Sequence, residues 1–340
     1  MKVLITGSSG QIGTNLALRL VADGHDIFGV DQRVNTWTDD FRYLLQDLSG
    51  PYPAFPDGIG GVPYPETDLV VHLAAHAKVH QLVAQPHRAL ENTMMTFNVL
   101  EYCRQRSLPL VFSSTREVYG DVHRFEGYGE ETADFAFTES PYSASKIASE
   151  AFIYAYARCY GLKYLAFRFS NVYGRYDNDL HRMSRVLPLF IHQMARDEPI
   201  TVYGGRDKVL DFTYVDDCVE GIVRGVEALG EGRVSNQTIN LAYGEGNTLV
   251  RAAELIAAEL GVAPKMTIAP SLLGEVTRYV ADIRKARDLL GWEPQVPLDE
   301  GIPRAVEWFR EHRATNPGEN RPVVNEGDSV GWKAVASSAG

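Results

Sequence analysis

Residues 2–13, KVLITGSSGQIG, decide the fold that this sequence predicts. The apolar run 3–5 is typical of a short strand buried in a parallel sheet. Residues 6–10 are rich in glycine and serine and predict a tight turn, and 11–22 has the pattern of a helix. The chain therefore opens with the strand–turn–helix unit of an α/β fold.

Three glycines in this unit, Gly7, Gly10 and Gly13, recur at a spacing of three. Such glycines let the backbone turn sharply, leave room for a ligand phosphate and bring the helix close to the strand. The N–H groups at the start of the helix then attract a diphosphate. A second predicted strand, 26–30, leads into Asp31, about 20 residues further on, where a carboxylate can bind a ribose 2′-hydroxyl. An ordinary βα turn is the alternative, but the combination favours a dinucleotide-binding site.

The composition is that of a globular protein. Of the 340 residues, 45% are hydrophobic and 23% are charged, which allows one large domain or two smaller ones. A net charge of −11 argues against nucleic acid as a partner. The three cysteines are isolated and fit a reducing compartment better than a disulfide scaffold or a zinc site. Because Met1 and Lys2 lead straight into a predicted core strand, we expect no signal peptide. No apolar run reaches the roughly 18 residues of a membrane span, so we expect no membrane contact, and we expect a cytoplasmic protein.

Strands and helices alternate through the first half of the chain, which favours a doubly wound parallel sheet. The further strands predicted there are 69–73, 110–113 and 165–169, and the helices are 88–105 and 141–160. Later the pattern loosens. The predicted helices there are 186–195, 215–225, 249–260 and 303–312, with short strands in 200–212 and 237–241, a strand-to-helix segment at 280–290, and loops at 50–65 and 175–185.

This pattern predicts a division into two domains. We expect residues 1–175 to form the dinucleotide-binding domain, with a return segment near 212–242. Residues 176–312 would form mainly a smaller, discontinuous C-terminal domain for the substrate. Residues 313–340 are rich in Gly, Asn, Ser and Pro, and we expect a flexible tail.

The sequence YSASK places Tyr142 and Lys146 four residues apart on a predicted helix, and so on one face. A nearby ammonium group stabilises a phenolate and lowers the pKa of the tyrosine. Tyr142 is therefore a candidate base for an alcohol hydroxyl, as oxidation by a nicotinamide requires. The alternative is a surface tyrosine and lysine on an amphipathic helix, which the upstream nucleotide motif disfavours.

A run of three hydroxyl residues, Ser113, Ser114 and Thr115, ends a predicted buried strand. At least one hydroxyl lies at the carboxyl edge of the sheet, where it can hydrogen-bond the reacting oxygen. The alternative is simply a polar strand end.

Together with HLAA at 72–75, VYG at 118–120, NVYG at 171–174 and DFTYVDD at 211–217, these motifs resemble the extended short-chain dehydrogenase/reductase family. The resemblance is to its nucleotide-sugar epimerase and dehydratase group and covers residues 1–312. It implies tightly held NAD, an N-terminal Rossmann domain, a UDP-sugar substrate and a homodimer built on the two long helices. It also implies that Thr115, Tyr142 and Lys146 are catalytic and that Asn171 lies near the substrate phosphates.

The glycine turn and this resemblance together assign a set of residues to NAD. They are Gly7, Gly10, Gln11, Ile12, Gly13, Asp31, Gln32, Asp47, Leu48, Leu73, Ala74, Ala75, Ser113, Tyr142, Lys146 and Val172.

The residues after Thr115 bear on the reaction. In similar 4-epimerases the tyrosine takes the C4 hydroxyl proton, NAD takes a hydride, and the 4-keto sugar turns before both return. In similar 4,6-dehydratases an Asp-Glu pair follows the threonine, whereas here the pair is Arg116–Glu117. Similar uronate decarboxylases also keep the glutamate, so Glu117 is either part of such chemistry or a structural carboxylate paired with Arg116. We expect a 4-epimerase; a UDP-uronate decarboxylase or NDP-sugar 4,6-dehydratase is the alternative, and a silent NAD-binding regulatory protein is a remote one.

Two arginines that the family uses on the substrate diphosphate are replaced here by leucines, at Leu210 and in the pair 272–273. A diphosphate still needs charge-assisted donors, and Arg185, Lys208 and Arg278 are the candidates for this role. The candidate substrate residues are Lys78, Thr115, Arg116, Glu117, Asn171, Arg182, Arg185, Lys208 and Arg278.

Three histidines, His72, His76 and His80, stand four residues apart, a spacing that would suggest a metal site on one continuous helix. The first ends a predicted strand and the next residues form a loop, so we expect no metal there.

The loop 175–185 contains Arg175, His181, Arg182 and Arg185, which is more positive charge than a neutral hexose requires. We expect Arg182 to pair with a C6 carboxylate of a UDP-uronic acid; the alternative is that these residues bind phosphate or face solvent. Substitution Arg182→Ala should then reduce kcat/KM for UDP-glucuronate much more than for UDP-glucose, because only the former carries the carboxylate. Steady-state kinetics with both sugars measures this, and an equal loss for both would contradict the pairing.

Overall fold

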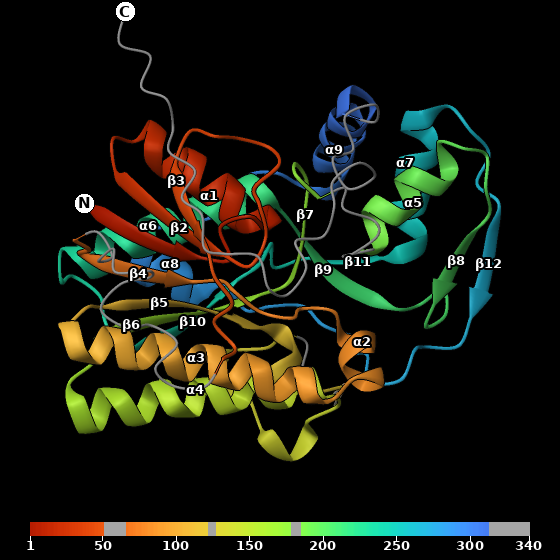
Figure 1. The fold of residues 1–340 in the computed structure, drawn as a ribbon. Coiled ribbons are helices and arrows are strands. Elements are labelled where there is room, and N and C mark those ends of the chain that lie inside the picture. Colours follow the sequence, from red (N-terminus) through yellow and green to blue (C-terminus); the bar gives the residue numbers. More distant parts are fainter. Residues whose placement is uncertain (51–65, 122–126, 178–184, 313–340) are drawn as a thin grey trace, which may run out of the picture.

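The computed structural model describes residues 1–50, 66–121, 127–177 and 185–312, and its centre is a seven-stranded parallel sheet (Figure 1). The strands are β1 (Lys2–Thr6), β2 (Asp26–Asp31), β3 (Arg42–Leu45), β4 (Leu69–His72), β5 (Leu110–Thr115), β6 (Tyr164–Phe169) and β10 (Gln237–Leu241). Their order is β10-β6-β5-β4-β1-β2-β3. The chain runs outward from β1 to β3 and then returns to β4 on the other side of β1. Open α/β sheets bind ligands at this kind of reversal, beyond the carboxyl ends of the strands. The predicted doubly wound sheet is confirmed.

Helices cover both faces of this sheet. One face carries α1 (Gln11–Ala22) and α6 (Val215–Gly230), and the other carries α3 (His87–Arg106) and α4 (Pro141–Tyr160) (Figure 1). The side chains of β1 alternate accordingly: Val3 and Ile5 belong to the core under α1, and Leu4 belongs to the core under α3. Burial on both sides explains why the parallel strands are apolar throughout.

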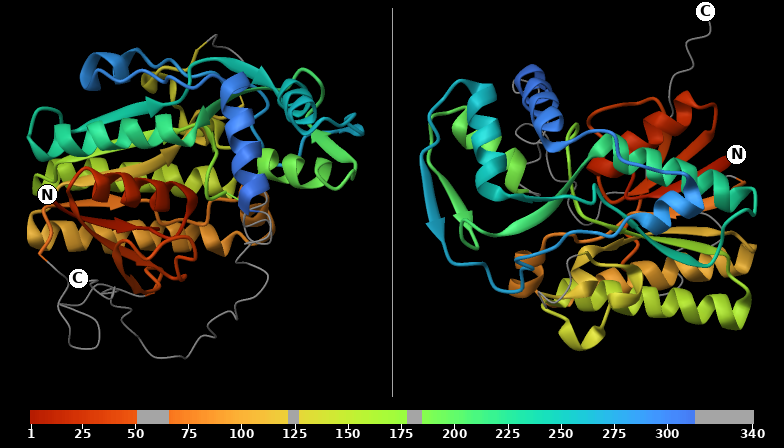
Figure 2. Two further views of the ribbon diagram at one scale, coloured as in Figure 1. Left: turned by 90° about the horizontal axis from the view of Figure 1, so that it is seen from above. Right: turned by 180° about the vertical axis from the view of Figure 1, so that it is seen from behind.

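A smaller layer of helices and short strands stands at one end of the large sheet, as two further views show (Figure 2). Its helices are α5 (Val186–Met194), α7 (Leu249–Leu260) and α9 (Leu298–His312). Its strands are β8 (Ile200–Tyr203) paired with β12 (Met266–Ala269), and β11 (Gly246–Thr248), β9 (Val209–Tyr214) and β7 (Asn171–Tyr173) in a second sheet. The chain then crosses back, because α6 packs on α1 and β10 pairs with β6. Short α2 (Val79–Ala84) follows β4, and α8 (Arg284–Leu290) packs on α6.

The predicted strand at the start of 280–290 is wrong. Only the helix α8 forms there, and Ala281 makes an isolated bridge to Tyr128. The backbone N–H of Ala281 donates to the carboxylate of Asp211 (3.2 Å), so it is not free to extend a strand ladder.

Two helix bounds also differ from the expectation. α6 continues to Gly230, because Gly225 serves close packing rather than termination: a Cβ there would lie 2.4 Å from the ring of Phe167. α9 begins at Leu298, with Asp299 and Glu300 in its first turn, and Pro303 lies inside the helix. Acidic residues favour a helix start, and here they outweigh the signal of the proline.

The predicted tail 313–340 and most of the loops 50–65 and 175–185 lie outside the described residues, and Arg182 lies there too. In the described part, no helix is both long and apolar enough to cross a membrane.

Asp211 of β9 joins three segments that are distant in sequence. Its buried carboxylate accepts the backbone N–H groups of Tyr243 (2.9 Å), Gly244 (2.9 Å) and Ala281 (3.2 Å). Its own carbonyl accepts the side-chain amide of Asn171 (3.0 Å). Asp211 therefore links β7 and β9 of the smaller layer to the segment after β10 and to the segment before α8.

Substitution Asp211→Ala should destabilise the protein by about 3 kcal/mol, because it leaves buried donors without an acceptor. Asp211→Asn should cost less, since it keeps one acceptor oxygen. Urea unfolding measures both, with Asp39→Ala at an exposed position as control. A decrease of less than about 0.5 kcal/mol in the free energy of unfolding of Asp211→Ala would contradict a stabilising role for these Asp211 contacts.

Candidate active site

A cavity of about 1400 Å³ runs along the carboxyl ends of the strands, from the glycine turn to β9 and α5. It is larger than an ordinary small-molecule pocket and can hold a dinucleotide together with a second nucleotide. Both the large sheet and the smaller layer line it.

The glycine turn forms one end of the cavity and requires its glycines. Gly7 has φ +75°, and a Cβ there would lie 2.7 Å from the backbone nitrogen of Ala74. A Cβ on Gly13 would lie 2.2 Å from the carbonyl oxygen of Gly7. Neither position can take a side chain, so α1 starts directly beside the end of β1, with its N-terminal N–H groups at the cavity.

Asp31 ends β2 at the rim of the same turn. Its carboxylate accepts the backbone N–H groups of Ser9 (2.9 Å) and Arg33 (2.9 Å), which fixes its orientation. It lines the cavity next to the turn, where a ribose hydroxyl can donate to it.

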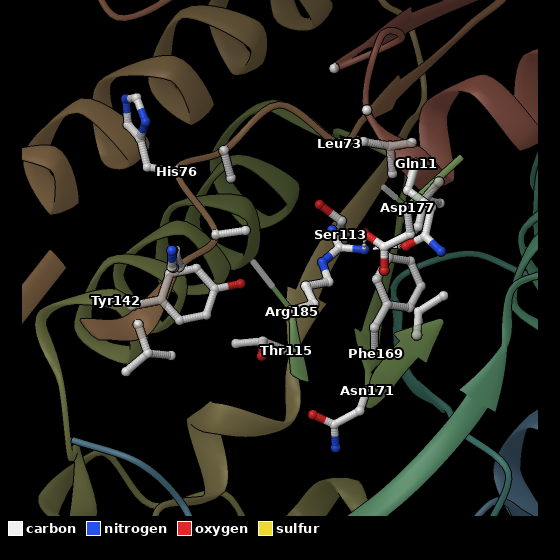
Figure 3. A pocket seen from close by; sticks show the side chains of 18 of the residues that line it. Gln11, Leu73, His76, Ser113, Thr115, Tyr142, Phe169, Asn171, Asp177 and Arg185 are labelled. Carbon is white, nitrogen blue, oxygen red and sulfur yellow. Dashed lines mark hydrogen bonds and ion pairs between the residues drawn. The ribbon is translucent and has the colours of Figure 1, made fainter. Parts of the chain in front are cut away.

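Thr115, Tyr142 and Lys146 all line the cavity, and Figure 3 shows Thr115 and Tyr142 near one another. Ser140 caps α4 through a reciprocal hydrogen-bond pair with Ser143, and Pro141 occupies the first turn, so the helix begins just before Tyr142. The phenol hydrogen-bonds with Thr115 at the end of β5. One turn further on, the Lys146 ammonium donates to the carbonyl of Ser113 (2.6 Å).

The sequence profile of the NAD-dependent epimerase/dehydratase family matches residues 3–242, over two thirds of the chain. The chain belongs to this family.

Individual relatives agree. UDP-glucuronic acid decarboxylase 1 of Xenopus tropicalis is 32% identical over 333 residues, which cover 93% of this chain and 74% of the relative. UDP-glucose 4-epimerase from Thermotoga maritima, solved with UDP-glucose, has a TM-score of 0.84 at 29% identity and covers 92% of this chain and 100% of that one. UDP-glucuronic acid 4-epimerase from Bacillus cereus, solved with UDP-glucuronic acid and NAD, has a TM-score of 0.81 at 25% identity and covers 92% and 99%.

This family member is an NAD-dependent nucleotide-sugar epimerase, as the resemblance in the sequence predicted. The site fits the cofactor, because the turn excludes side chains where a diphosphate can approach, and the Asp31 carboxylate lines the cavity beside the turn, where it can accept from a ribose hydroxyl. All of the residues that the sequence assigned to NAD line the one cavity, although their individual contacts stay predictions.

The prediction that Lys146 lowers the pKa of Tyr142 is wrong for this arrangement. Burial and, after it, the Glu117 carboxylate raise the pKa of Tyr142 to about 12, although the hydrogen bond with Thr115 and the positive charge of Arg185 oppose the rise. Burial also lowers the pKa of Lys146 to about 7. The amine is bound to the Ser113 carbonyl, so desolvation of the two groups outweighs their spacing on the helix.

Arg116 and Glu117 line the cavity and form a tight turn directly after Thr115. The Thr115 hydroxyl accepts the backbone N–H of Glu117 (3.3 Å) and so starts this turn. The Arg116 Nη2 lies 3.0 Å from Glu117 Oε1 and donates to Asn171 (3.4 Å). Among the described residues, Arg116 Nη1 and Glu117 Oε2 are buried without a hydrogen-bond partner. Burial raises the pKa of Glu117, and Arg116 opposes this.

The other predicted substrate residues divide into two groups. Lys78, Arg185 and Lys208 line the cavity, and Lys208 pairs with Glu275 (2.7 Å). Arg278 is exposed and does not line the cavity, and its backbone N–H donates to Asp121. Lys208 lies two residues before Leu210, and both line the cavity, so Lys208 can supply the charge that the leucine lacks.

Sequence reasoning missed Glu275 and Phe169, which also line the cavity. Phe169 ends a predicted strand at the same sheet edge as Ser113, so the edge rule could have found it. Glu275 carried no local signal, because its partner Lys208 is remote in the chain.

The three spaced histidines are separated by the fold. His72 is buried in β4 and bonded to Thr6 (2.6 Å), His76 contacts Glu91 (2.8 Å), and His80 lies in α2. Among the described residues, no three His, Cys, Asp or Glu side chains come together as a possible metal site.

Lys146 should make stability depend on pH. In the unfolded chain its pKa is near 10.5, and in the fold it is about 7, so between these values the unfolded chain binds more protons. The free energy of unfolding should therefore rise between pH 7 and 9 by up to about 1.4 kcal/mol per pH unit from this group. Urea unfolding of NAD-free protein measures the slope, and Lys146→Met should remove that rise. Equal slopes for both proteins would contradict a buried, weakly basic Lys146.

Proposed function

We propose that this enzyme inverts C4 of a UDP-sugar, with UDP-glucuronate (to UDP-galacturonate) or UDP-glucose as substrate, through a transient 4-keto sugar. The observation that supports the proposal is that Thr115, Tyr142 and Lys146 line the same cavity as the glycine turn and the polar residues Arg116 and Glu117. Tyr142 is also hydrogen-bonded to Thr115.

NAD, when bound, accepts a hydride from C4 and later returns it, and it brings a positively charged ring into the cavity. Positive charge beside the Tyr142 phenol offsets the rise in pKa that burial causes. Tyr142 then takes the proton of the C4 hydroxyl as the ketone forms. After the keto sugar has turned, Tyr142 returns the proton to the C4 oxygen. Thr115 holds the phenol in place, and Lys146 holds the strand end through Ser113.

The sugar end of the cavity supports a uronate. A C6 carboxylate could accept from Arg116 Nη1, which is buried and unpartnered among the described residues. Burial raises the pKa of Glu117, so a substrate carboxylate can compete with Glu117 for Arg116. Lys208 is the candidate for the substrate diphosphate, and Asn171, which accepts a hydrogen bond from Arg116, lines the same cavity. Similar proteins from Thermotoga maritima and Bacillus cereus were solved with UDP-glucose and UDP-glucuronic acid, respectively.

Decarboxylation of a UDP-uronate is the second candidate, because Glu117 places a buried carboxyl group next to Thr115 in the chain, and one of its oxygens has no partner in the part of the chain that the structure describes. The Xenopus relative carries that name. Arg116 is a cation where dehydratases need an acid, which disfavours 4,6-dehydration, and the intact Thr115–Tyr142 contact disfavours a silent regulatory protein.

The proposal also includes a cytoplasmic homodimer. Side by side, α3 and α4 present the exposed apolar side chains of Leu90, Met94 and Phe152, which a second copy could cover.

Purified enzyme should convert UDP-glucuronate or UDP-glucose into an isomer of unchanged mass, which chromatography with mass detection resolves. Tyr142→Phe should lower this rate by about 10²–10⁴-fold, because the proton acceptor is lost. Tyr160→Phe, at an exposed position on the same helix, is the control. Release of CO₂ would support the decarboxylase instead, and loss of water would support the dehydratase. No reaction with any UDP-sugar would contradict all three activities.

A further inference from the structure

Arg185 crosses the cavity toward the glycine turn. It precedes α5 at the helix cap, on the side of the smaller layer, and lines the cavity. Its guanidinium Nη1 donates to the side-chain oxygen of Gln11 and lies 3.3 Å from the Asp177 carboxylate, whose side chain is 4% exposed (Figure 3). A charged group from one layer is thus held against the first residue of α1 in the other.

Gln11 offers a second donor at the same place. It is the first residue of α1, is 6% exposed and lines the cavity. The described residues give its Nε2 no hydrogen-bond partner, although that atom is buried. A buried amide donor without a partner is costly, and a ligand oxygen would remove the cost.

Arg185 lies close to two parts of the cavity, the glycine turn and the wall that holds Tyr142. On one side it contacts Gln11, next to the turn and the N–H groups that attract a diphosphate. On the other side its positive charge acts on the Tyr142 phenol, at this wall. The substrate-diphosphate candidate Lys208 has a different partner, Glu275.

We propose that Arg185 and Gln11 bind the diphosphate of NAD, so that Arg185 serves the cofactor and not the substrate diphosphate to which the sequence assigned it. The guanidinium supplies the charge-assisted donor that the uncharged glycine turn lacks. Asp177 keeps the guanidinium in place, and the Gln11 amide supplies a neutral donor beside it. This role requires only NAD binding and holds whichever sugar the enzyme uses.

The contact would also keep NAD in place between turnovers. An epimerase regenerates its cofactor within each reaction, so release of NAD serves no step. A bound diphosphate that contacts α1 and the residue before α5 ties the two layers together, and NAD could leave only when these contacts break.

Three variants test the proposal by binding rather than by turnover. Arg185→Met keeps the length of the side chain without its charge. Gln11→Glu keeps the shape and can still pair with Arg185, so folding is preserved, but it repels a diphosphate. Arg196→Met is the control, because Arg196 is exposed at the far end of α5 and pairs only locally with Glu198.

We expect Arg185→Met and Gln11→Glu to lose NAD during gel filtration and to bind NAD and ADP-ribose about 10- to 100-fold more weakly than the parent. Binding of AMP, which lacks the diphosphate, should change less than threefold, and so should binding of UDP. Titration calorimetry on NAD-free protein measures all four ligands.

Other outcomes would overturn the proposal. A loss of UDP affinity with unchanged NAD affinity in Arg185→Met would return Arg185 to the substrate. Unchanged affinity for every ligand, with a lowered melting temperature, would make the Arg185–Gln11 contact a structural bridge alone. An equal loss for AMP and ADP-ribose would place the arginine away from the diphosphate.

Discussion

The absence of a side chain at Gly13 is the constraint on which the rest of the structure depends. The position that a Cβ would take lies 2.2 Å from the Gly7 carbonyl, so any other residue would push α1 away from β1. Their close packing sets where α1 begins, and the start of α1 sets where the positive end of its dipole meets the cavity. The reversal of strand order beside β1 then opens the sheet at the same place. One steric requirement therefore positions both the anion site and the crevice that leads to it.

The cavity wall around Thr115 places ionisable groups where they are poorly solvated. Tyr142, Lys146, Arg116 and Glu117 are all buried, and each has a cost of desolvation that hydrogen bonds repay only in part. The Glu150 carboxylate next to this wall is well paired, because it accepts from Ser114 (2.5 Å) and from Arg168 (2.7 Å). This ion pair holds the end of β5 in place through Ser114. Polar atoms left over at the surface of this wall are therefore the ones available to a substrate.

Features with local causes were predictable from the sequence. The glycine turn follows from sterics, the bounds 141–160 of α4 follow from Ser140, Pro141 and Gly161 at its two ends, and the apolar strands follow from burial on both faces. Features with distant causes were not predictable. The raised pKa of Tyr142 arises from burial by the assembled fold, and the missing strand near 281 arises from a carboxylate 70 residues away. Likewise, the sequence predicted a positive charge at Arg185 but not the contact of Arg185 with Gln11, because Gln11 lies 174 residues earlier in the chain.

The pairing of β10 with β6 bears on how the chain is made. β6 ends at Phe169, and its open edge is covered only when Leu241 has been added. At a rate of about 5–20 residues per second, a ribosome leaves that edge uncovered for roughly 4 to 14 s. During this interval the nascent sheet presents unpaired backbone groups that can recruit another strand. Completion of the nucleotide-binding half therefore depends on a segment translated after much of the smaller layer has emerged, and a chain truncated near residue 175 would retain the open edge permanently.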